Sequence, residues 1–187
     1  MRTLDAMDGQ RQPIWNFVEV GCPFNNGNCI QPAQIRAGVW HSIIAGARGI
    51  EYFNHSFSGP CQTHYVLRSS CGNYPAVRAT VTAVNQQIQQ LAPVLNAPSV
   101  TSGTTTSAGV RALYKWYDGH FYVLAGNREN VSTTGTMGLS CIGNATAVKL
   151  GEDGERIPVT AGTFMDEFAD GNAIHIYRID GGSRCGL

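Results

Sequence analysis

A short apolar run near the start of the chain, residues 13–20, constrains the fold most strongly. It contains β-branched and aromatic residues, opens on Pro13 and stops before Gly21, and these features are typical of a buried strand. Glu19 is the only charged residue in this run. A carboxylate there is costly unless it is paired, hydrogen-bonded or used in chemistry. Glu19 is therefore a candidate functional residue.

The segment that follows predicts a βαβ unit. A loop over residues 21–31 leads to Pro32, which suits the first position of a helix. Apolar residues then recur at helical spacing, and residues 49–55 form a second apolar strand. Strand, helix and strand in this order predict a parallel pair, whose C-terminal ends carry the functional residues in such units. A second helix is expected over residues 75–95.

The C-terminal half has the pattern of a small antiparallel β-sandwich. Residues 99–109 are rich in Ser, Thr and Gly and suit a linker or a first edge strand. Beyond them, short strands alternate with turn signals such as Asp118-Gly119. The last two expected strands pair with each other across Asp170-Gly171. Strands are expected at 110–117, 120–127, 134–141, 145–150, 155–159, 163–168 and 173–179.

The six cysteines suggest disulfides rather than a metal site. Cysteines that lie close in sequence predict two bonds that each close a loop after a strand, Cys22–Cys29 and Cys61–Cys71. Cys141 and Cys185 remain, and their pairing is open. Zinc is the alternative, but the spacings are not those of a zinc ribbon and no histidine pair completes a site. Disulfides indicate an extracellular, oxidising compartment, although no signal peptide is visible in this sequence.

Composition and motifs give no support to several kinds of partner and activity. The formal net charge is zero, which gives no reason to expect a nucleic acid or an anionic membrane surface. No apolar run approaches the roughly 18 residues of a membrane span. No nucleophile-elbow motif G-x-S-x-G of Ser-His-Asp hydrolases is present. Neither a cofactor nor a metal ion is expected.

Three groups of residues, taken in order, resemble the last quarter of a (β/α)8-barrel glycoside hydrolase. They are Pro13-x-Trp15-x-Phe17-x-Glu19, Pro32-x-x-Ile35-Arg36-x-x-Val39-Trp40 and Ala45-Gly46-Ala47-Arg48-Gly49-Ile50-x-Tyr52-Phe53. The likeness is to the clan of retaining enzymes whose nucleophile is a Glu at the end of the seventh strand. The C-terminal segment resembles the β-sandwich that often follows such barrels, through Tyr114-x-x-Tyr117-Asp118-Gly119-x-Phe121-Tyr122-Val123 and Phe168-Ala169-x-Gly171-x-Ala173-Ile174-His175-Ile176-Tyr177-Arg178.

The resemblance implies a fold class of α/β plus all-β. Residues 1–98 would form a partial barrel of two βα units, and residues 99–187 the C-terminal β-sandwich. The first six barrel strands would lie before residue 1. The chain is then expected to be a C-terminal fragment, a truncated product, or a homo-oligomer that covers its incomplete barrel.

The resemblance also implies a site for a carbohydrate substrate with β-linked sugars. Glu19 would be the nucleophile of a retaining reaction, which needs a second carboxyl group roughly 5–5.5 Å away. In this clan the acid/base residue comes from the fourth strand, so Glu51 or another subunit would have to supply it here. The expected substrate-binding residues are Trp15, Tyr52, Phe53, Asn54 and His55.

A non-catalytic carbohydrate-binding or structural β-sandwich protein is the alternative interpretation. It predicts that Glu19 is locked in an ion pair with Arg36 or Arg48. It also predicts exposed aromatic residues in a row on one sheet face, namely Trp116, Tyr117 and Tyr122. Glu51 has a structural interpretation too, as the partner of Arg48 or Arg78 in a buried ion pair.

Overall fold

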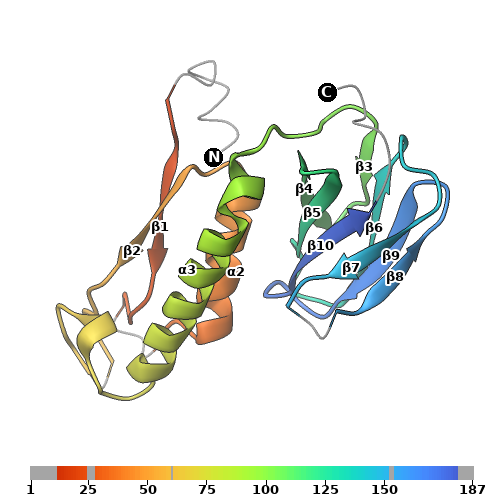
Figure 1. Ribbon diagram of the computed structural model, residues 1–187. Helices are drawn as coiled ribbons and strands as arrows, with labels where there is room; N and C mark the ends of the chain where they lie inside the picture. Colours follow the sequence, from red (N-terminus) through yellow and green to blue (C-terminus); the bar gives the residue numbers. More distant parts are fainter. Residues whose placement is uncertain (1–11, 25–27, 60, 152–153, 181–187) are drawn as a thin grey trace. The chain divides into compact units, whose positions relative to one another are not determined.

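The computed structural model describes residues 12–24, 28–59, 61–151 and 154–180 (Figure 1). The chain divides into two compact units, Met1–Gln89 and Gln90–Leu187. The first contains the βαβ unit and most of a second helix, and the second contains the antiparallel strands. Each unit has its own cluster of buried apolar side chains.

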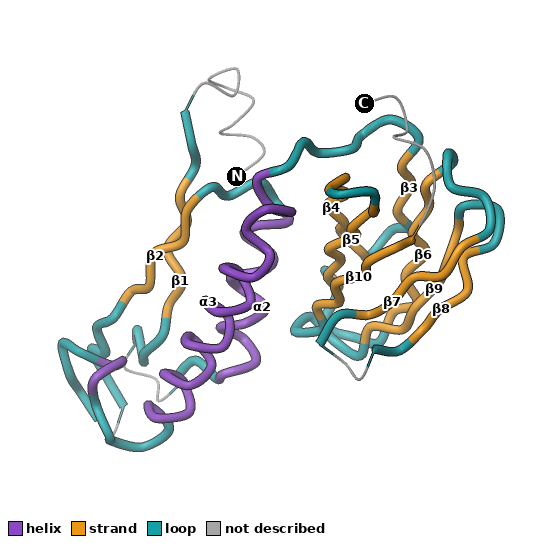
Figure 2. The backbone as a smooth tube through the Cα atoms, viewed as in Figure 1, coloured by secondary structure: helices purple, strands orange, loops and turns teal. Residues whose placement is uncertain are grey.

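The first unit contains the parallel pair that the sequence predicts. Strands β1 (Trp15–Glu19) and β2 (Gly49–Phe53) pair in parallel, and helix α2 (Pro32–Ile44) connects them. A short 3-10 helix η1 (Val66–Arg68) and the long helix α3 (Tyr74–Asn96) follow. Both α-helices lie on the same side of the two-stranded sheet (Figure 2).

The strand register determines which side chains share a face. Because Phe17 lies opposite Glu51 and Glu19 opposite Phe53, these four side chains project from the same side of the sheet. The intervening residues project toward the helices and join a core that includes Val18, Val20, Ile35, Val39, Val77, Val81 and Val84. The face that carries Glu19 is not covered in the same way, and Phe17 is 65% exposed. We call it the open face.

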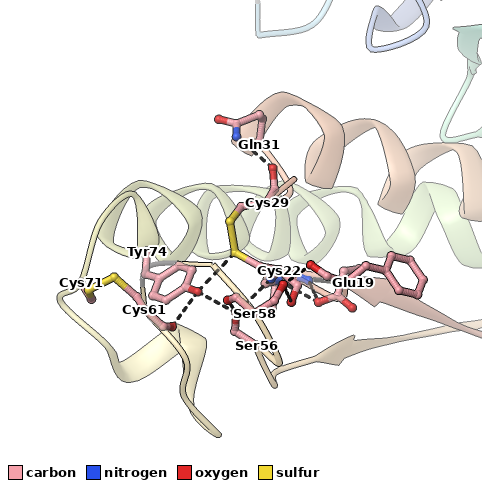
Figure 3. Close-up of a disulfide and its surroundings, with 12 residues drawn as sticks. Glu19, Cys22, Cys29, Gln31, Ser56, Ser58, Cys61, Cys71 and Tyr74 are labelled. Carbon is pink, nitrogen blue, oxygen red and sulfur yellow. Dashed lines mark hydrogen bonds between the residues drawn. A yellow bond between two sulfur atoms is a disulfide. The ribbon is translucent and has the colours of Figure 1, made fainter. Parts of the chain in front are cut away.

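Two disulfides close the loops at the C-terminal ends of β1 and β2. Cys22 is bonded to Cys29, and Cys61 is bonded to Cys71, as predicted (Figure 3). Cys141 is also in a disulfide, whereas Cys185 lies outside the described residues. The two bonded loops therefore border the same end of the sheet as Glu19.

A buried polar network joins the two disulfide loops (Figure 3). The backbone N–H of Cys22 donates to Ser56 Oγ at 3.1 Å, and the N–H of Ser58 donates to Cys22 O at 3.2 Å. The hydroxyl of Tyr74, at the start of α3, lies 2.9 Å from Ser56 Oγ and 3.0 Å from Cys61 O. Tyr74 is 2% exposed, so water does not reach its hydroxyl group. The hydrogen bonds to Ser56 and Cys61 satisfy the hydroxyl group instead.

The second unit is a β-sandwich of two antiparallel sheets. The order β4-β5-β10-β7-β8 forms the larger sheet, and β3-β6-β9 forms the smaller one. Residues 104–106 form an edge strand, one of the two possibilities left open by the sequence. The strand bounds are β3 (Thr104–Thr106), β4 (Val110–Tyr117), β5 (His120–Asn127), β6 (Thr133–Leu139), β7 (Ala145–Lys149), β8 (Arg156–Val159), β9 (Thr163–Phe168) and β10 (Ile174–Asp180).

The expected hairpin of the last two strands is wrong. β9 pairs with β6 in the small sheet, while β10 pairs with β5 and β7 in the large one. The turn around Asp170 therefore carries the chain from one sheet to the other. The two strands meet through their side chains across the core, where the rings of Phe164 and Tyr177 lie 4.9 Å apart. Local turn residues could not distinguish this arrangement from a hairpin.

A polar cluster inside the sandwich also joins the two sheets. Asp166 on β9 accepts bonds at Oδ2 from Lys149 Nζ on β7 (2.8 Å) and from Tyr177 Oη on β10 (2.6 Å). His175 Nδ1 lies 2.8 Å from the same oxygen, and the backbone N–H of Glu167 donates to Oδ1. Burial raises the pKa of Asp166, but the bonds from His175, Lys149 and Tyr177 outweigh it and hold the pKa well below the usual 3.8.

We expect Tyr74→Phe to lower the free energy of unfolding by about 1–2 kcal/mol, because it removes a buried hydroxyl and leaves polar partners unsatisfied. Chemical denaturation of the oxidised protein measures the change. Tyr65→Phe is the matched control, since Tyr65 is exposed and the structure records no bond to its hydroxyl. Equal stability of the two variants would contradict a structural role for the network.

We expect Asp166→Asn to lower the free energy of unfolding by about 3 kcal/mol at neutral pH, because Lys149 loses its buried counter-charge. The wild type should also lose stability as the pH falls below about 4, at up to about 1.4 kcal/mol per pH unit. Stability falls with pH because the unfolded chain takes up a proton at Asp166 near the ordinary pKa of 3.8, whereas the folded chain does so only at lower pH.

Denaturation curves at several pH values test both effects. Asp166→Asn should lack this residue's contribution to the acid-side loss. Glu155→Gln is the control, since it removes the exposed partner of the same lysine, 2.7 Å away, and should cost less than about 1 kcal/mol. An Asp166→Asn variant with wild-type acid dependence would overturn the assignment.

Candidate active site at the ends of β1 and β2

Glu19 ends β1 and is held by the backbone that follows it. Its Oε1 accepts hydrogen bonds from the N–H groups of Val20 at 2.9 Å and Gly21 at 2.8 Å. Two N–H donors at one oxygen fix the direction of this carboxyl group. Among the described residues Glu19 forms no ion pair, so its predicted pairing with Arg36 or Arg48 is not observed.

Gly21 allows the backbone to turn closely behind Glu19. A Cβ at Gly21 would lie 2.9 Å from the carbonyl oxygen of His55 and 3.1 Å from a methyl group of Val66. Any larger residue would push the loops after β1 and β2 apart. The sequence shows the glycine but does not show which backbone approaches it.

Glu51 is the second carboxylate on the open face. It lies opposite Phe17 and therefore two residues before Phe53, the partner of Glu19. Strand spacing and rise place the Cα atoms of the two glutamates about 8 Å apart, within reach of a common small ligand. Glu51 is half-buried, and the described residues place no ion pair on it, so the predicted partners Arg48 and Arg78 do not pair with it. Arg78 instead donates to the Leu67 carbonyl.

An aromatic cluster, defined as Phe53, His55, Phe57, His64 and Tyr65, extends beyond the end of β2. The ring of Phe57 lies 4.0 Å from that of His55 and 6.0 Å from that of Phe53. His55 Nδ1 and His64 Nδ1 are 3.1 Å apart, so one imidazole donates and the other accepts. His64 in turn lies beside Tyr65, with 6.5 Å between the ring centroids.

The loop that carries this cluster is firmly held. Ser56 and Thr63 exchange backbone hydrogen bonds at 2.8 and 3.2 Å, which closes a short antiparallel bridge between His55 and His64. The Cys61–Cys71 disulfide ties the loop to the start of α3. Phe57 and Tyr65 nevertheless stay more than half exposed. Large apolar rings that are fixed but uncovered are available to a ligand.

The structure brings together only some of the residues predicted for substrate binding. Phe53 and His55 belong to the aromatic cluster at the same end of the sheet as Glu19. Trp15 shares the open face, but it is four residues before Glu19, about 13 Å along the strand. Its indole instead covers Gly49, where a Cβ would lie 2.5 Å from the ring.

Tyr52 and Asn54 point elsewhere. The Tyr52 hydroxyl donates to Asn85 Oδ1 on α3 at 2.8 Å, so this side chain lies on the helix side of the sheet, and burial raises its pKa. Asn54 Oδ1 accepts the N–H of Leu67 at 2.8 Å and helps to start η1. The alternation of side chains along β2 separates Tyr52 from Glu19, and a stricter use of that two-residue period would have predicted it.

Phe57, His64 and Tyr65 are absent from the residues predicted from the sequence. A weak signal exists, because all three lie in or beside the loop that leads into the Cys61–Cys71 pair. Their approach to His55 depends on the bridge between Ser56 and Thr63, which no local pattern specifies. No group of three or more His, Cys, Asp or Glu residues suited to a metal ion occurs in the described parts of the chain.

Comparison with known proteins identifies the fold but no family. No family model and no curated protein matches the sequence. No helix in the described ranges is both long and apolar enough to cross a membrane. Solved structures that are similar to this chain include glycoside hydrolases, at low sequence identity.

Three of these structures illustrate the likeness. An α-amylase from Anoxybacillus has a TM-score of 0.61 at 12% identity, over 91% of this chain and 39% of its own. AmyP, solved with maltotriose, has a TM-score of 0.63 at 13% identity, over 97% and 44%. A family GH30 endoxylanase from Clostridium papyrosolvens has a TM-score of 0.50 at 12% identity, over 97% and 45%. The chain thus spans about two fifths of each and is similar to them in fold.

Proposed function

We propose that the chain is the C-terminal part of a retaining glycoside hydrolase, with the first unit as two βα units of a (β/α)8 barrel. The observation that carries the proposal is the position of Glu19. Its carboxylate lies at the C-terminal end of a parallel strand, on the open face, with one oxygen fixed by two backbone N–H groups. Catalytic residues of such barrels occupy this end of the strands. Fold similarity to glycoside hydrolases supports the assignment.

In this proposal Glu19 attacks the anomeric carbon of a β-linked sugar. The bond between that carbon and the leaving oxygen breaks, and a covalent glycosyl-enzyme forms. A second carboxyl group protonates the leaving oxygen and later removes a proton from the attacking water. Glu51 is the carboxyl group that this chain itself supplies on the same face. The Val20 and Gly21 N–H groups orient the Glu19 carboxyl group for this attack.

The aromatic cluster would contact the sugar. Phe53 and Phe57 offer apolar faces to the C–H side of a sugar ring, and the two linked imidazoles offer hydrogen-bonding nitrogens to its hydroxyl groups. The network around Tyr74 would keep this surface in place relative to Glu19. We infer an extracellular location from the disulfides, because they persist in oxidising compartments.

We further propose that self-association covers the open face. Exposed Trp15, Phe17 and Phe53 lie on a two-stranded sheet, and each strand has an edge without a partner among the described strands. Apolar faces and unpaired strand edges favour association with another chain.

We expect Glu19→Gln to abolish glycoside cleavage, with kcat/KM lowered by about 10³-fold or more. Suitable substrates are the 2,4-dinitrophenyl β-glycosides of glucose, galactose and xylose, whose leaving group departs without protonation. Release of dinitrophenolate measures turnover, and intact-mass spectrometry detects a glycosyl adduct. The wild type should form the adduct on the peptide that contains Glu19.

Glu51→Gln separates the two carboxylate roles. It should slow cleavage of unactivated oligosaccharides by about 10²- to 10⁴-fold while the dinitrophenyl glycosides still form the adduct. The absence of an adduct with every sugar, from folded wild-type protein, would refute the proposed nucleophile. An adduct that persists in Glu19→Gln would refute it equally.

We expect the wild type to sediment as a dimer or a larger oligomer at micromolar concentration. Phe17→Glu should shift it toward the monomer, because a charge on the covered face must be desolvated. Val131→Glu is the control, since Val131 is as exposed but lies in the sandwich unit. A monomeric wild type in sedimentation velocity would contradict self-association.

A further inference from the structure

A cavity lies within the sandwich unit, and its lining includes none of the residues of the candidate active site. Its volume is about 740 Å³, within the range of small-molecule sites. It lies beside the β4–β5 turn, and all of its lining residues belong to Gln90–Leu187. The lining is formed by Pro93, Asn96, Ala97, Pro98, Trp116, Tyr117, Asp118 and Gly119.

Hydrogen bonds hold the two walls of this cavity together. The buried Lys115, on β4, donates from Nζ to the Ala97 carbonyl at 2.7 Å. The N–H of Val100 donates to the Tyr114 carbonyl at 2.9 Å, so the segment after α3 follows the edge of β4. Asp118 and Gly119 both have positive φ, as a tight two-residue turn requires. The backbone segments on the two sides of the cavity are therefore connected to each other.

Trp116 and Tyr117 contribute differently to the lining. The expected row of Trp116, Tyr117 and Tyr122 is wrong, because Trp116 faces the core and its ring meets Phe121 at 4.4 Å. Tyr117 follows on the opposite side of β4 and is 39% exposed. Trp116 thus gives a rigid wall, while Tyr117 offers an accessible ring.

The chemistry of the lining suits a neutral sugar. Tyr117 and the two prolines offer apolar surface to the C–H face of a pyranose ring, and the Tyr117 hydroxyl adds a polar tip. Asn96 donates from Nδ2 to the Ala92 carbonyl, which fixes its amide while Oδ1 has no recorded bond. Asp118 forms no ion pair among the described residues, so its carboxylate can accept bonds from hydroxyl groups.

We propose that this cavity binds an oligosaccharide independently of Glu19. A non-catalytic sugar site on the sandwich would keep a polymeric substrate near the chain without taking part in bond cleavage. Apolar rings beside an amide and a carboxylate favour this ligand over an anion, because no lysine or arginine is among the lining residues. The proposal does not need the first unit to be catalytic.

Titration of the full chain with maltotriose, cellotriose and xylotriose tests the proposal. Nuclear magnetic resonance follows the indole N–H of Trp116 and the amide of Gly119. At least one of the sugars should give saturable shifts at both probes, at millimolar concentration. Tyr117→Ala should weaken this binding by about tenfold or more. Asp118→Asn, which tolerates the positive φ of the turn, should weaken it by about threefold while the fold is preserved.

Two controls distinguish this site from the candidate active site. Tyr122→Ala changes a tyrosine of the adjacent strand that does not line the cavity and should leave the affinity unchanged. Glu19→Gln should leave it unchanged as well, even if it abolishes cleavage. No shift with any sugar up to about 20 mM, or equal affinity in wild type, Tyr117→Ala and Asp118→Asn, would overturn the proposal.

Discussion

The parallel pairing of β1 with β2 is the constraint on which the first unit depends. Its register puts Glu19, Glu51 and Phe53 on one face and the apolar partners of the helices on the other. Helices cover only that second face, because a right-handed βαβ connection places its helix on one side of the strands. Among the described residues of this unit, the open face carries two half-buried carboxylates and the exposed rings of Trp15, Phe17 and Phe53.

The loops that follow β1 and β2 are held against each other at the end of the sheet where Glu19 lies. Disulfides close the two loops. The buried hydrogen bonds of Ser56, Ser58 and Tyr74 determine how the two loops lie against each other. Gly21 permits their close approach. As a result, the backbone N–H groups that hold Glu19 and the imidazole of His55 belong to one rigid assembly. Such preorganisation is what a catalytic or binding site requires.

The sandwich unit shows how polar groups can join two sheets. Asp166, in the small sheet, accepts hydrogen bonds from side chains of the large sheet. These bonds lower the pKa of Asp166 more than burial raises it. The same unit carries a cavity whose walls come from the segment after α3 and from the β4–β5 turn. Comparison with solved glycoside hydrolases extends over both units, although the chain spans only about two fifths of their length.

Local sequence patterns were enough to predict the helices, most of the strands and two disulfides. Periodicity and turn residues placed the βαβ unit, the long helix and most sandwich strands within a few residues, and cysteine proximity identified both loop disulfides. Local patterns work for these features because propensity, burial period and short loop closure act over neighbouring residues.

Contacts between residues that are distant in sequence became visible only in the folded chain. The tertiary structure separated β9 from β10 into different sheets, turned Tyr52 and Trp116 away from their expected positions, and brought Phe57 and His64 to His55. It also gave Glu19 two backbone N–H partners, where the alternative interpretation predicted Arg36 or Arg48. These outcomes depend on strand register and on contacts between distant segments. The side of the strand that Tyr52 occupies follows from the two-residue alternation, but no local pattern gives the pairing of strands or the contacts between distant segments.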